Sequence, residues 1–493
     1  MRTNKNLWPI TVLTVAGLLL STNAYTHQSP AFSRESWRED YQALKRYLHE
    51  GYANLEWMQK HRKIDLVALD AKTRQSLSEA RTDEEATRAL KQFLEAFSDG
   101  HLGLREASES NTDEKKDPQI INSDTSGREV CRSLGYGVRL RNFSIPIDKD
   151  PGFRMVSTGR DAFATGILSI NNGKKYGALR IPLFSPTGYW LNCEQGWDEY
   201  RKRLTGDCGP QCQWQFRVFT ADRLSAMLAE QVKVLRSMKV DGLIVDIGGN
   251  GGGTEWVDPV ARILSEKRLR APKVGRIRHP HSARAIERNI ALVEKDLARK
   301  DLTPQQTKIL IEAKKRLNQV ASEVGSPCDK SKIWTSAGGK TGCSMMNSTP
   351  IFSTGVFDYA RPGEFEGLLS KSALFVSSLY SYEEGAFKGP LIILADRSTA
   401  SASEYFAAMF QDNEAAIIAG EPTRGVGCGY TNGGLNLTLP NSNLRVAMPD
   451  CSRYRKDGTN EIEGVNPDLM IWDKDDDKPA RAAKFLEALR GLK

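Results

Sequence analysis

The chain has 493 residues, of which 40% are hydrophobic and 26% charged, and its formal net charge is +8. This length allows roughly two or three domains with a sizeable core, and the composition excludes a disordered or fibrous chain. The positive charge is small and dispersed, so it argues against a nucleic-acid partner and supports at most a weak preference for anionic surfaces.

Residues 1–24 have the features of a secretory signal peptide. The basic residues Arg2 and Lys5 precede an apolar run from Leu7 to Leu20, and small residues precede Ala24. The apolar run is short for a membrane span, and no second stretch of spanning length follows. We therefore expect an exported protein, periplasmic or secreted, with no membrane span after signal removal. An uncleaved N-terminal anchor is the alternative.

Eight cysteines follow this segment, and an even number in an exported chain favours disulfides over metal ligation. We predict four pairs: Cys428–Cys451, Cys328–Cys343, Cys208–Cys212 and, by remainder, Cys131–Cys193. Eight cysteines allow many other connectivities, so these pairs are a hypothesis. The pair His279 and His281 has no third ligand nearby, and we expect no metal site there.

The first part of the chain is predicted to be helical. Apolar residues recur at three- and four-residue steps between residues 33 and 97, which predicts an N-terminal helical domain over residues 33–106. Residues 107–130 are polar and charged, with almost no large apolar side chains, so we expect a linker or long loop.

Short apolar runs broken by Gly, Pro and Asn then predict buried strands. They read GALRIPLF from Gly177, GLIVDI from Gly242 and PLIILAD from Pro390, and the helical pattern ADRLSAMLAEQVKVLRSM separates the first two. This alternation of strand, helix and strand predicts an α/β core, whose two parts we assign to residues 131–278 and 346–493.

Residues 279–345 interrupt this core with two helical patterns, 282–300 and 304–322. Thr303 suits a helix N-cap followed by Pro304 at the first helical position. The apolar stripes predict a helical hairpin, and its many charges are most simply solvated faces. Because a charged amphipathic pair cannot be buried within a sheet, we expect the hairpin to lie beside the functional cleft and to restrict what enters it.

A glycine-rich turn, GLIVDIGGNGGGTEW (Gly242–Trp256), ends one predicted strand. Without side chains, such a turn lets backbone amides come close to a bound group. It spells neither a phosphate loop nor a dinucleotide fingerprint. The two interpretations left open are a tight turn without a ligand and a donor of amides to an oxyanion.

The stretch STASASEYFAAMFQD, from Ser398 to Asp412, leads from a predicted strand into a predicted helix. Ser401 and Glu404 spell the S-x-x-E capping box, so a simple helix cap is one interpretation. The other is a nucleophile at the positive end of a helix, where free amides favour developing negative charge.

A serine nucleophile needs a base, and the sequence offers few. No lysine occurs between Lys388 and Lys456, so a nearby lysine base is excluded. Among six histidines, only His101 lies in a glycine-flanked loop, SDGHLGL, that follows a predicted helix. Taken alone, such a histidine is more often a surface residue than a catalyst.

Five segments in order carry a family resemblance: SDGHLGL, GLIVDIGGNGGG, STASASEYFAAMFQD, AIIAGEPTRGVG and EIEGVNPDLMI. Together with the helical region before them, they resemble the tail-specific, or C-terminal processing, serine peptidases. The chain looks closest to their tricorn-like and retinoid-binding-protein-like branch, over residues 35–472. The resemblance implies an α/β fold with a ClpP/crotonase-like catalytic core of βαβ units, an N-terminal helical domain and a helical-hairpin insertion. No PDZ signature separates the helical region from the core.

The resemblance places the nucleophile at Ser401, the middle serine of STASASE. It implies that the oxyanion is held by the amide of Ala402 and by the glycine turn around Gly251 and Gly252.

The resemblance implies His101 as the general base, because Val426 occupies the position of the lysine of the lysine-dependent branch. It places a glutamate that orients the histidine at Glu461, with Glu463 as the runner-up. The tricorn-like branch tends to have a serine beside its histidine, where this chain has Gly100.

The function that the resemblance implies is an exported serine endopeptidase acting on peptides or unfolded proteins, without a metal or organic cofactor. A rival from another class is a non-catalytic protein that binds apolar ligands or peptides on the same fold. An esterase using the same nucleophile is a third possibility. A serine, a histidine and a glutamate at matching positions favour the peptidase.

Overall fold

The computed structural model describes residues 32–106, 121–137, 141–170, 173–335, 342–431 and 433–491. The predicted signal peptide therefore lies outside the described residues. The helices are α1 (Arg34–Gly51), α2 (Leu55–Lys60), α3 (Leu66–Glu79), α4 (Asp83–Glu95), α5 (Gly127–Ser133), α6 (Trp190–Tyr200), α7 (Pro210–Ser237), α8 (Val257–Leu264), α9 (Pro280–Leu297), α10 (Pro304–Val324), α11 (Lys371–Leu374), α12 (Ala402–Asp412) and α13 (Lys478–Gly491).

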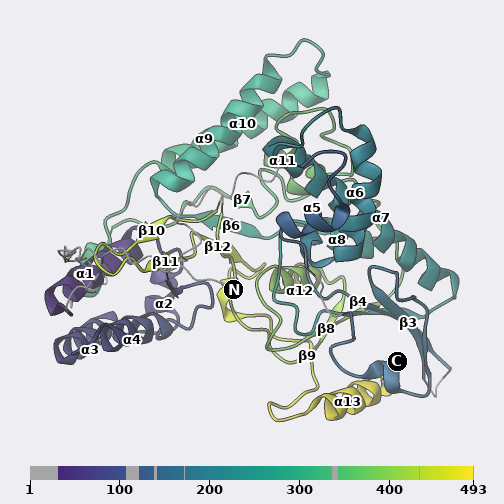
Figure 1. The fold of residues 1–493 in the computed structure, drawn as a ribbon, viewed down its shortest axis with the longest axis horizontal. Coiled ribbons are helices and arrows are strands. Elements are labelled where there is room, and N and C mark those ends of the chain that lie inside the picture. The colour runs from purple at the N-terminus through teal and green to yellow at the C-terminus, as the bar shows by residue number, and fades with distance from the viewer. Residues whose placement is uncertain are drawn as a thin grey trace, which may run out of the picture.

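The strands form one large and two small sheets (Figure 1). The large sheet has the order β13 (Leu469–Met470), β9 (Ile417–Gly420), β8 (Leu391–Ala395), β5 (Gly242–Asp246), β4 (Lys175–Arg180), β3 (Ala164–Ser169) and β2 (Phe153–Met155). The second sheet has the order β12 (Cys451–Tyr454), β6 (Lys273–Arg276) and β7 (Ile351–Phe352), and the third β1 (Gly103–Arg105), β11 (Arg445–Ala447) and β10 (Leu437–Thr438).

The large sheet is parallel from β13 to β4 and antiparallel from β4 to β2. Its central strands are buried on both sides, as continuous apolar runs require. Leu243 and Val245 of β5 face a core shared with α7, α8 and α12, whereas Ile244 faces the core beneath α13. This arrangement confirms the predicted α/β fold class.

The N-terminal helices α1–α4 pack around one core, to which later segments of the chain also contribute (Figure 1). Ser33, Asp65 and Thr82 cap three of these helices with side-chain hydrogen bonds. The same core includes residues of β11, so this domain is attached to the third sheet. Residues 107–120 of the expected linker over residues 107–130 lie outside the described residues. The end of that range overlaps α5, because Ser126 and Glu129 form a capping box that starts a helix there.

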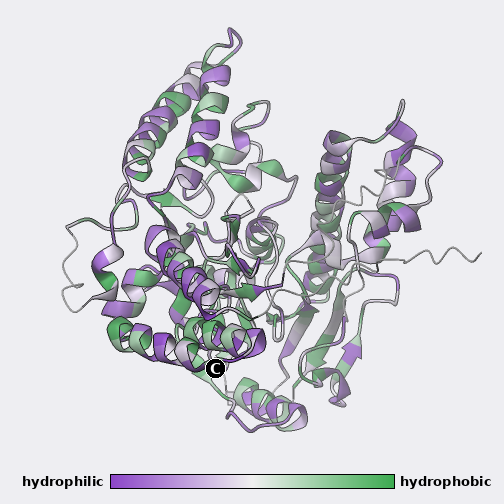
Figure 2. Cartoon of the chain, turned by 60° about the vertical axis from the view of Figure 1, so that its left-hand side comes forward, coloured by the Kyte–Doolittle hydropathy of each residue, from purple (hydrophilic) through white to green (hydrophobic). Residues whose placement is uncertain are grey.

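The predicted hairpin is formed by α9 and α10. Thr303 and Gln306 form a capping box at the start of α10, and Pro304 occupies its first turn. Apolar residues of both helices share one core with residues of β6 and β7. Figure 2 shows the two-sided character of these helices, and Figure 1 shows the hairpin projecting from the body of the molecule.

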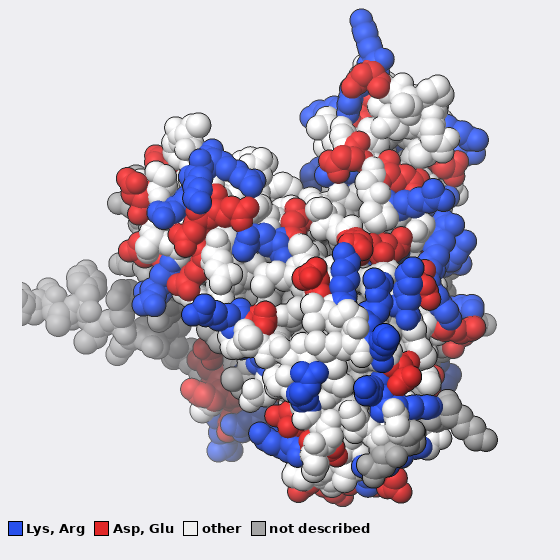
Figure 3. All heavy atoms as spheres, turned by 90° about the vertical axis from the view of Figure 1, so that its right-hand side faces the viewer, with Lys and Arg blue, Asp and Glu red and all other residues white. Residues whose placement is uncertain are grey.

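The structure confirms all four predicted disulfides: Cys131–Cys193, Cys208–Cys212, Cys328–Cys343 and Cys428–Cys451. On the face shown in Figure 3, basic and acidic side chains are interspersed, as the modest net charge implies. Among the described residues, no helix combines the length and apolar character that crossing a membrane requires.

Candidate active site

A cavity of about 570 Å³ contains the residues that the sequence analysis singled out. Ser401, His101, Gly251 and Ala402 all line it. The fold therefore brings a loop of the N-terminal domain to the turn between β8 and α12, although 300 residues of chain separate His101 from Ser401.

Ser401 has an unusual backbone conformation. Its φ of 57° and ψ of −116° place a non-glycine residue in a sparsely populated region, immediately before the first residue of α12. Such strain costs on the order of 1–3 kcal/mol and persists where the surroundings enforce it, often at functional sites. The Glu404 carboxylate accepts a hydrogen bond from the Ser401 amide at 2.8 Å, as in a capping box. Ser401 therefore takes part in the helix cap and also lines the cavity.

Glu404 also holds the loop that follows β9. Its buried carboxylate accepts hydrogen bonds from the Thr423 hydroxyl at 2.7 Å and from the amides of Gly425 and Val426 at 2.6 and 3.0 Å. One carboxylate thus fixes the position of this loop relative to Ser401.

His101 is bonded to that loop through its ring. Nδ1 lies 3.2 Å from the Val426 carbonyl oxygen, and because a carbonyl can only accept, Nδ1 carries the proton. Nε2 is then free to accept a proton. The pKa of His101 is lowered to about 4, mainly by burial and in smaller part by the nearby Arg453 charge, against the raising effect of the Val426 carbonyl. The imidazole is therefore neutral near pH 7, as a general base must be.

Gly100 and Val426 are matched by size. A Cβ on Gly100 would lie 3.2 Å from Val426 Cγ1, which is tighter than ordinary contact. The valine at the family's lysine position therefore packs where a serine side chain beside the histidine would otherwise begin.

The two predicted orienting glutamates have other partners in this structure. The Glu461 carboxylate forms an ion pair with Arg453, and its Oε1 is buried without a hydrogen-bond partner among the described residues. Glu463 Oε1 accepts hydrogen bonds from Trp57 Nε1 at 2.6 Å and Arg62 Nε at 2.9 Å, which attaches it to the N-terminal domain. Neither carboxylate therefore contacts the imidazole, contrary to the expectation that one of them orients it. The Val426 carbonyl is the partner of His101 Nδ1 instead.

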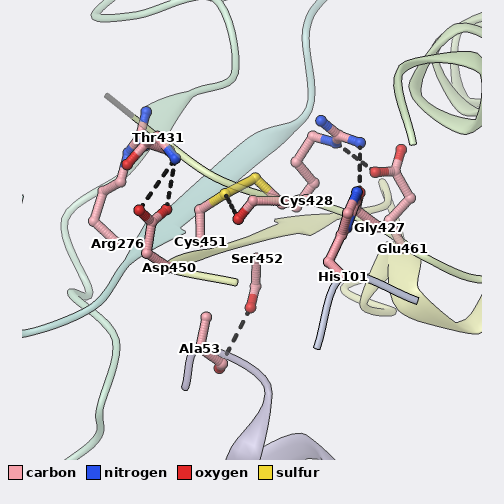
Figure 4. The surroundings of a disulfide bond; sticks show 12 residues. Ala53, His101, Arg276, Gly427, Cys428, Thr431, Asp450, Cys451, Ser452 and Glu461 are labelled. Carbon is pink, nitrogen blue, oxygen red and sulfur yellow. Dashed lines mark hydrogen bonds and ion pairs between the residues drawn. A yellow bond between two sulfur atoms is a disulfide. The ribbon is translucent and has the colours of Figure 1, made fainter. Parts of the chain in front are cut away.

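Arg453 connects several parts of the site. Besides its ion pair with Glu461, its Nη2 donates to the Ser401 carbonyl at 3.3 Å and to the Gly427 carbonyl at 3.2 Å. Its guanidinium lies over the Tyr405 ring at 5.2 Å from the centroid. Figure 4 shows Glu461, Gly427 and His101 on the same side of the Cys428–Cys451 disulfide.

The predicted oxyanion donors divide into two groups. Gly251 and Ala402 line the cavity, and neither amide has a hydrogen-bond acceptor among the described residues. The Gly252 amide instead donates to Asn250 Oδ1 at 3.0 Å, so it is not available to an oxyanion. Gly252 is needed for a close approach: a Cβ there, at φ 111°, would lie 2.8 Å from Ser401 Cβ.

A buried polar network joins the N-terminal domain to this site. Asn54 Nδ2 donates to Asp99 Oδ2 at 3.1 Å, and Asp99 Oδ1 accepts the His101 amide at 2.9 Å. Asn54 Oδ1 accepts from Ser452 at 2.8 Å and from Asn460, the residue before Glu461, at 2.9 Å. Figure 4 shows Ser452 directed toward the N-terminal domain at Ala53.

Three of these contributors escaped sequence reasoning: the linking role of Arg453, the Val426 carbonyl and the Asn54 network. Nothing in the local sequence marks them, because each acts through a tertiary contact. The sequence marks Glu404 only as a capping residue, through its S-x-x-E spacing from Ser401.

Comparison with solved structures identifies the fold. The structure of mature CPAF matches at 15% identity over 93% of this chain and 97% of that one, with a TM-score of 0.55. Its complex with lactacystin matches at 14% identity over 93% of this chain and 98% of that one, with a TM-score of 0.56. The photosystem II D1 C-terminal processing protease is a weaker match, at 13% identity over 92% of this chain and 97% of that one, with a TM-score of 0.34.

The sequence itself matches a family model. The model for peptidase family S41 matches residues 214–471, a segment that includes the glycine turn, Ser401 and Glu461. Since this segment is more than half of the chain, the protein belongs to peptidase family S41, within the tail-specific serine peptidase superfamily that its motifs resemble.

Proposed function

We propose that this peptidase is an exported serine endopeptidase in which Ser401 is the nucleophile and His101 the general base. The observation that supports this most directly is the shared cavity, which is lined by a strained serine, a neutral histidine, and Gly251 and Ala402, whose amides have no acceptor among the described residues. These are the parts that acyl transfer by a serine requires.

In the proposed reaction, Ser401 Oγ bonds to the peptide carbonyl carbon while its proton passes to His101 Nε2. The amides of Gly251 and Ala402 hold the oxyanion. The C–N bond then breaks as His101 returns the proton to the leaving amine, and water hydrolyses the acyl-enzyme by the same route. At every stage of this reaction, the Val426 carbonyl accepts a hydrogen bond from the proton on His101 Nδ1.

We assign Glu461 a positioning and electrostatic role in this Ser-His-Glu site. Arg453 lies close enough to His101 to lower its pKa and so opposes formation of the imidazolium. The Glu461 carboxylate offsets that charge through its ion pair with Arg453. In this proposal Glu461 acts on His101 through Arg453 and not by direct contact.

The proposal that the protein is exported is supported by two features. Residues 1–24 have the pattern of a signal peptide, and the four disulfides are of a kind that persists in oxidising compartments.

The decisive experiment incubates the purified chain with a reduced and alkylated protein and a peptide library, beside Ser401→Ala, and identifies cleavage sites by mass spectrometry. We expect internal cleavage by the wild type alone. Cleavage that survives the substitution would remove Ser401 as the nucleophile. Absence of cleavage by both proteins, together with binding of apolar ligands by both, would favour the non-catalytic binding protein.

A further inference from the structure

One wall of the cavity is a face of the second sheet. Strands β6 and β12 pair in antiparallel register, with Arg276 opposite Cys451 and Val274 opposite Arg453. Residues directly opposite in such a pair point to the same side, as do residues two apart along each strand. Arg276, Val274 and Arg453 accordingly all line the cavity that contains Ser401.

The two arginines of this wall differ in their partners. The Arg453 guanidinium is engaged by the Glu461 carboxylate and by two backbone carbonyls. The Arg276 side chain is only partly buried where it lines the cavity, and its guanidinium donates no hydrogen bond to a described residue. One of its nitrogens, Nη1, is enclosed by the protein without a partner. Burial lowers the pKa of Arg276, and no carboxylate of the described part of the chain forms an ion pair with it.

The acidic groups around Arg276 act on it only through space. Asp450 lies beside it but directs both carboxylate oxygens to the Thr431 amide, at 2.9 and 3.1 Å, and lies 3.3 Å from His281 Nε2 (Figure 4). Glu255 is exposed and also lines the cavity. Both carboxylates raise the pKa of Arg276 from a distance and so oppose the larger, lowering effect of burial. A guanidinium stays protonated in proteins, so the Arg276 side chain is a cation without an ion-pair partner among the described residues.

A guanidinium that lines a cavity without a hydrogen-bond partner of its own can bind a carboxylate, the group that matches its charge and its donors best. Asp450 and Glu255 repel a second carboxylate held at a distance, so only a group that bonds the cavity-facing side of the guanidinium directly gains net energy. We propose that Arg276 forms a subsite for an acidic side chain, Asp or Glu, of the peptide substrate. This inference rests on the proposed function, because it takes the cavity to be where the peptide binds.

The test uses the full chain and peptides of about ten residues, built on a Gly, Ala, Ser and Leu background. Two series of peptides are made, one with a single Glu and one with a single Gln at each position in turn. Every peptide is made both as a free acid and as a C-terminal amide. Binding is measured in the Ser401→Ala background by fluorescence anisotropy, and cleavage is measured separately in the wild type. The variants are Arg276→Gln, the charge-conserving Arg276→Lys, and the control Lys273→Gln. Lys273 is an exposed cation of the same strand on its opposite face.

We expect one peptide position at which Glu binds about tenfold more tightly than Gln, the size of one charge-assisted hydrogen bond. Arg276→Gln should bring that ratio close to one, Arg276→Lys should restore part of it, and Lys273→Gln should leave it unchanged. A thermal denaturation curve for each variant shows whether the protein is folded. Should Arg276→Gln fail to fold, the ratios of the parent and of Arg276→Lys carry the test.

Three results would overturn the subsite: equal binding of Glu and Gln at every position, a preference that survives Arg276→Gln, or a dependence on the free C-terminal acid alone. The proposed function fails differently. In that case neither the wild type nor Arg276→Gln cleaves any peptide, whatever the binding ratios are.

Discussion

At the scale of single residues, the main finding is that a backbone carbonyl holds the imidazole of His101. A carbonyl cannot become protonated near neutral pH and does not titrate, so the Nδ1 tautomer is retained over a wide pH range. Burial supplies the other half of the arrangement, since it keeps the ring neutral.

The lowered pKa of His101 predicts how pH affects this residue. Between about pH 6.5 and pH 4 the unfolded chain binds a proton at this ring and the native chain does not. The free energy of unfolding should therefore fall as the pH decreases through this window, by up to about 3 kcal/mol, and be unaffected by this group above it. NMR titration of the His101 ring, assigned by comparison with His101→Gln, should give a midpoint near 4. A midpoint near 6.5 would contradict the buried neutral ring.

Glu461→Gln tests the electrostatic role proposed for that residue. The substitution keeps the shape but leaves the charge of Arg453 without its partner, so forming the imidazolium becomes harder. We expect kcat to fall on the order of tenfold to a hundredfold with little change in KM. Glu463→Gln, which removes a carboxylate bonded to Trp57 and Arg62, is the matched control and should leave kcat nearly unchanged. Equal effects of the two substitutions would reject the assignment.

At the scale of elements, the site depends on how loops are fastened to α12 and to the N-terminal domain. Glu404 fastens the loop after β9, and Asn54 connects the His101 loop with β12 and the turn that carries Glu461. Each is a buried hub whose partners come from separate segments of the chain, so each loss affects several segments at once.

Glu404→Gln is expected to displace the loop that carries the Val426 carbonyl. The carboxylate receives only donors, and an amide NH₂ in its place would face at least one of the backbone amides that it now accepts. We expect a loss of 1–3 kcal/mol in stability, roughly the cost of a buried unsatisfied group, and at least a tenfold lower kcat. Glu414→Gln, at an exposed position just after α12, provides the control. Full activity of Glu404→Gln would show that the loop does not depend on this carboxylate.

At the scale of the whole molecule, the cavity is assembled from distant parts of the chain. The N-terminal domain supplies His101, and the large sheet supplies the turns at Gly251 and Ser401. The second sheet supplies Arg276 and Arg453, and α9 supplies Asn289. The hairpin of α9 and α10 therefore reaches the cavity, as the lid hypothesis requires, although its tip projects away from the body.

Asn289→Trp tests whether the hairpin restricts the entry of peptides. The larger side chain would narrow the cavity from the hairpin side, so kcat/KM should fall more for long peptides than for short ones, on the order of tenfold. Glu287→Trp, on an exposed position of the same helix, should change neither value. If Asn289→Trp affected short and long peptides equally, the hairpin would not act as a selective lid.

The sequence by itself determined the elements whose signals are local. Continuous apolar runs identified the strands β5 and β8, which are buried on both sides. Apolar periodicity identified the N-terminal helices and the hairpin, because burial of one face imposes that periodicity. The motif order identified Ser401, His101 and the glycine turn, and the tertiary structure brings them to one cavity. The four disulfide pairs were predicted as a hypothesis, the last of them by remainder, because eight cysteines allow many connectivities and only the structure selects one.

Only the tertiary structure decided which groups contact one another within the site. Glu461 pairs with Arg453 because strand β12 carries the arginine past it, and no sequence pattern relates the two partners. The Val426 carbonyl reaches His101 because Glu404 holds its loop and Gly100 leaves room for the valine side chain. The Gly252 amide donates to Asn250 and not to the cavity because of the path of the glycine turn. The number of glycines in the sequence does not predict that path. Backbone groups are identical in every residue, so their partners depend on the path of the chain and not on its letters.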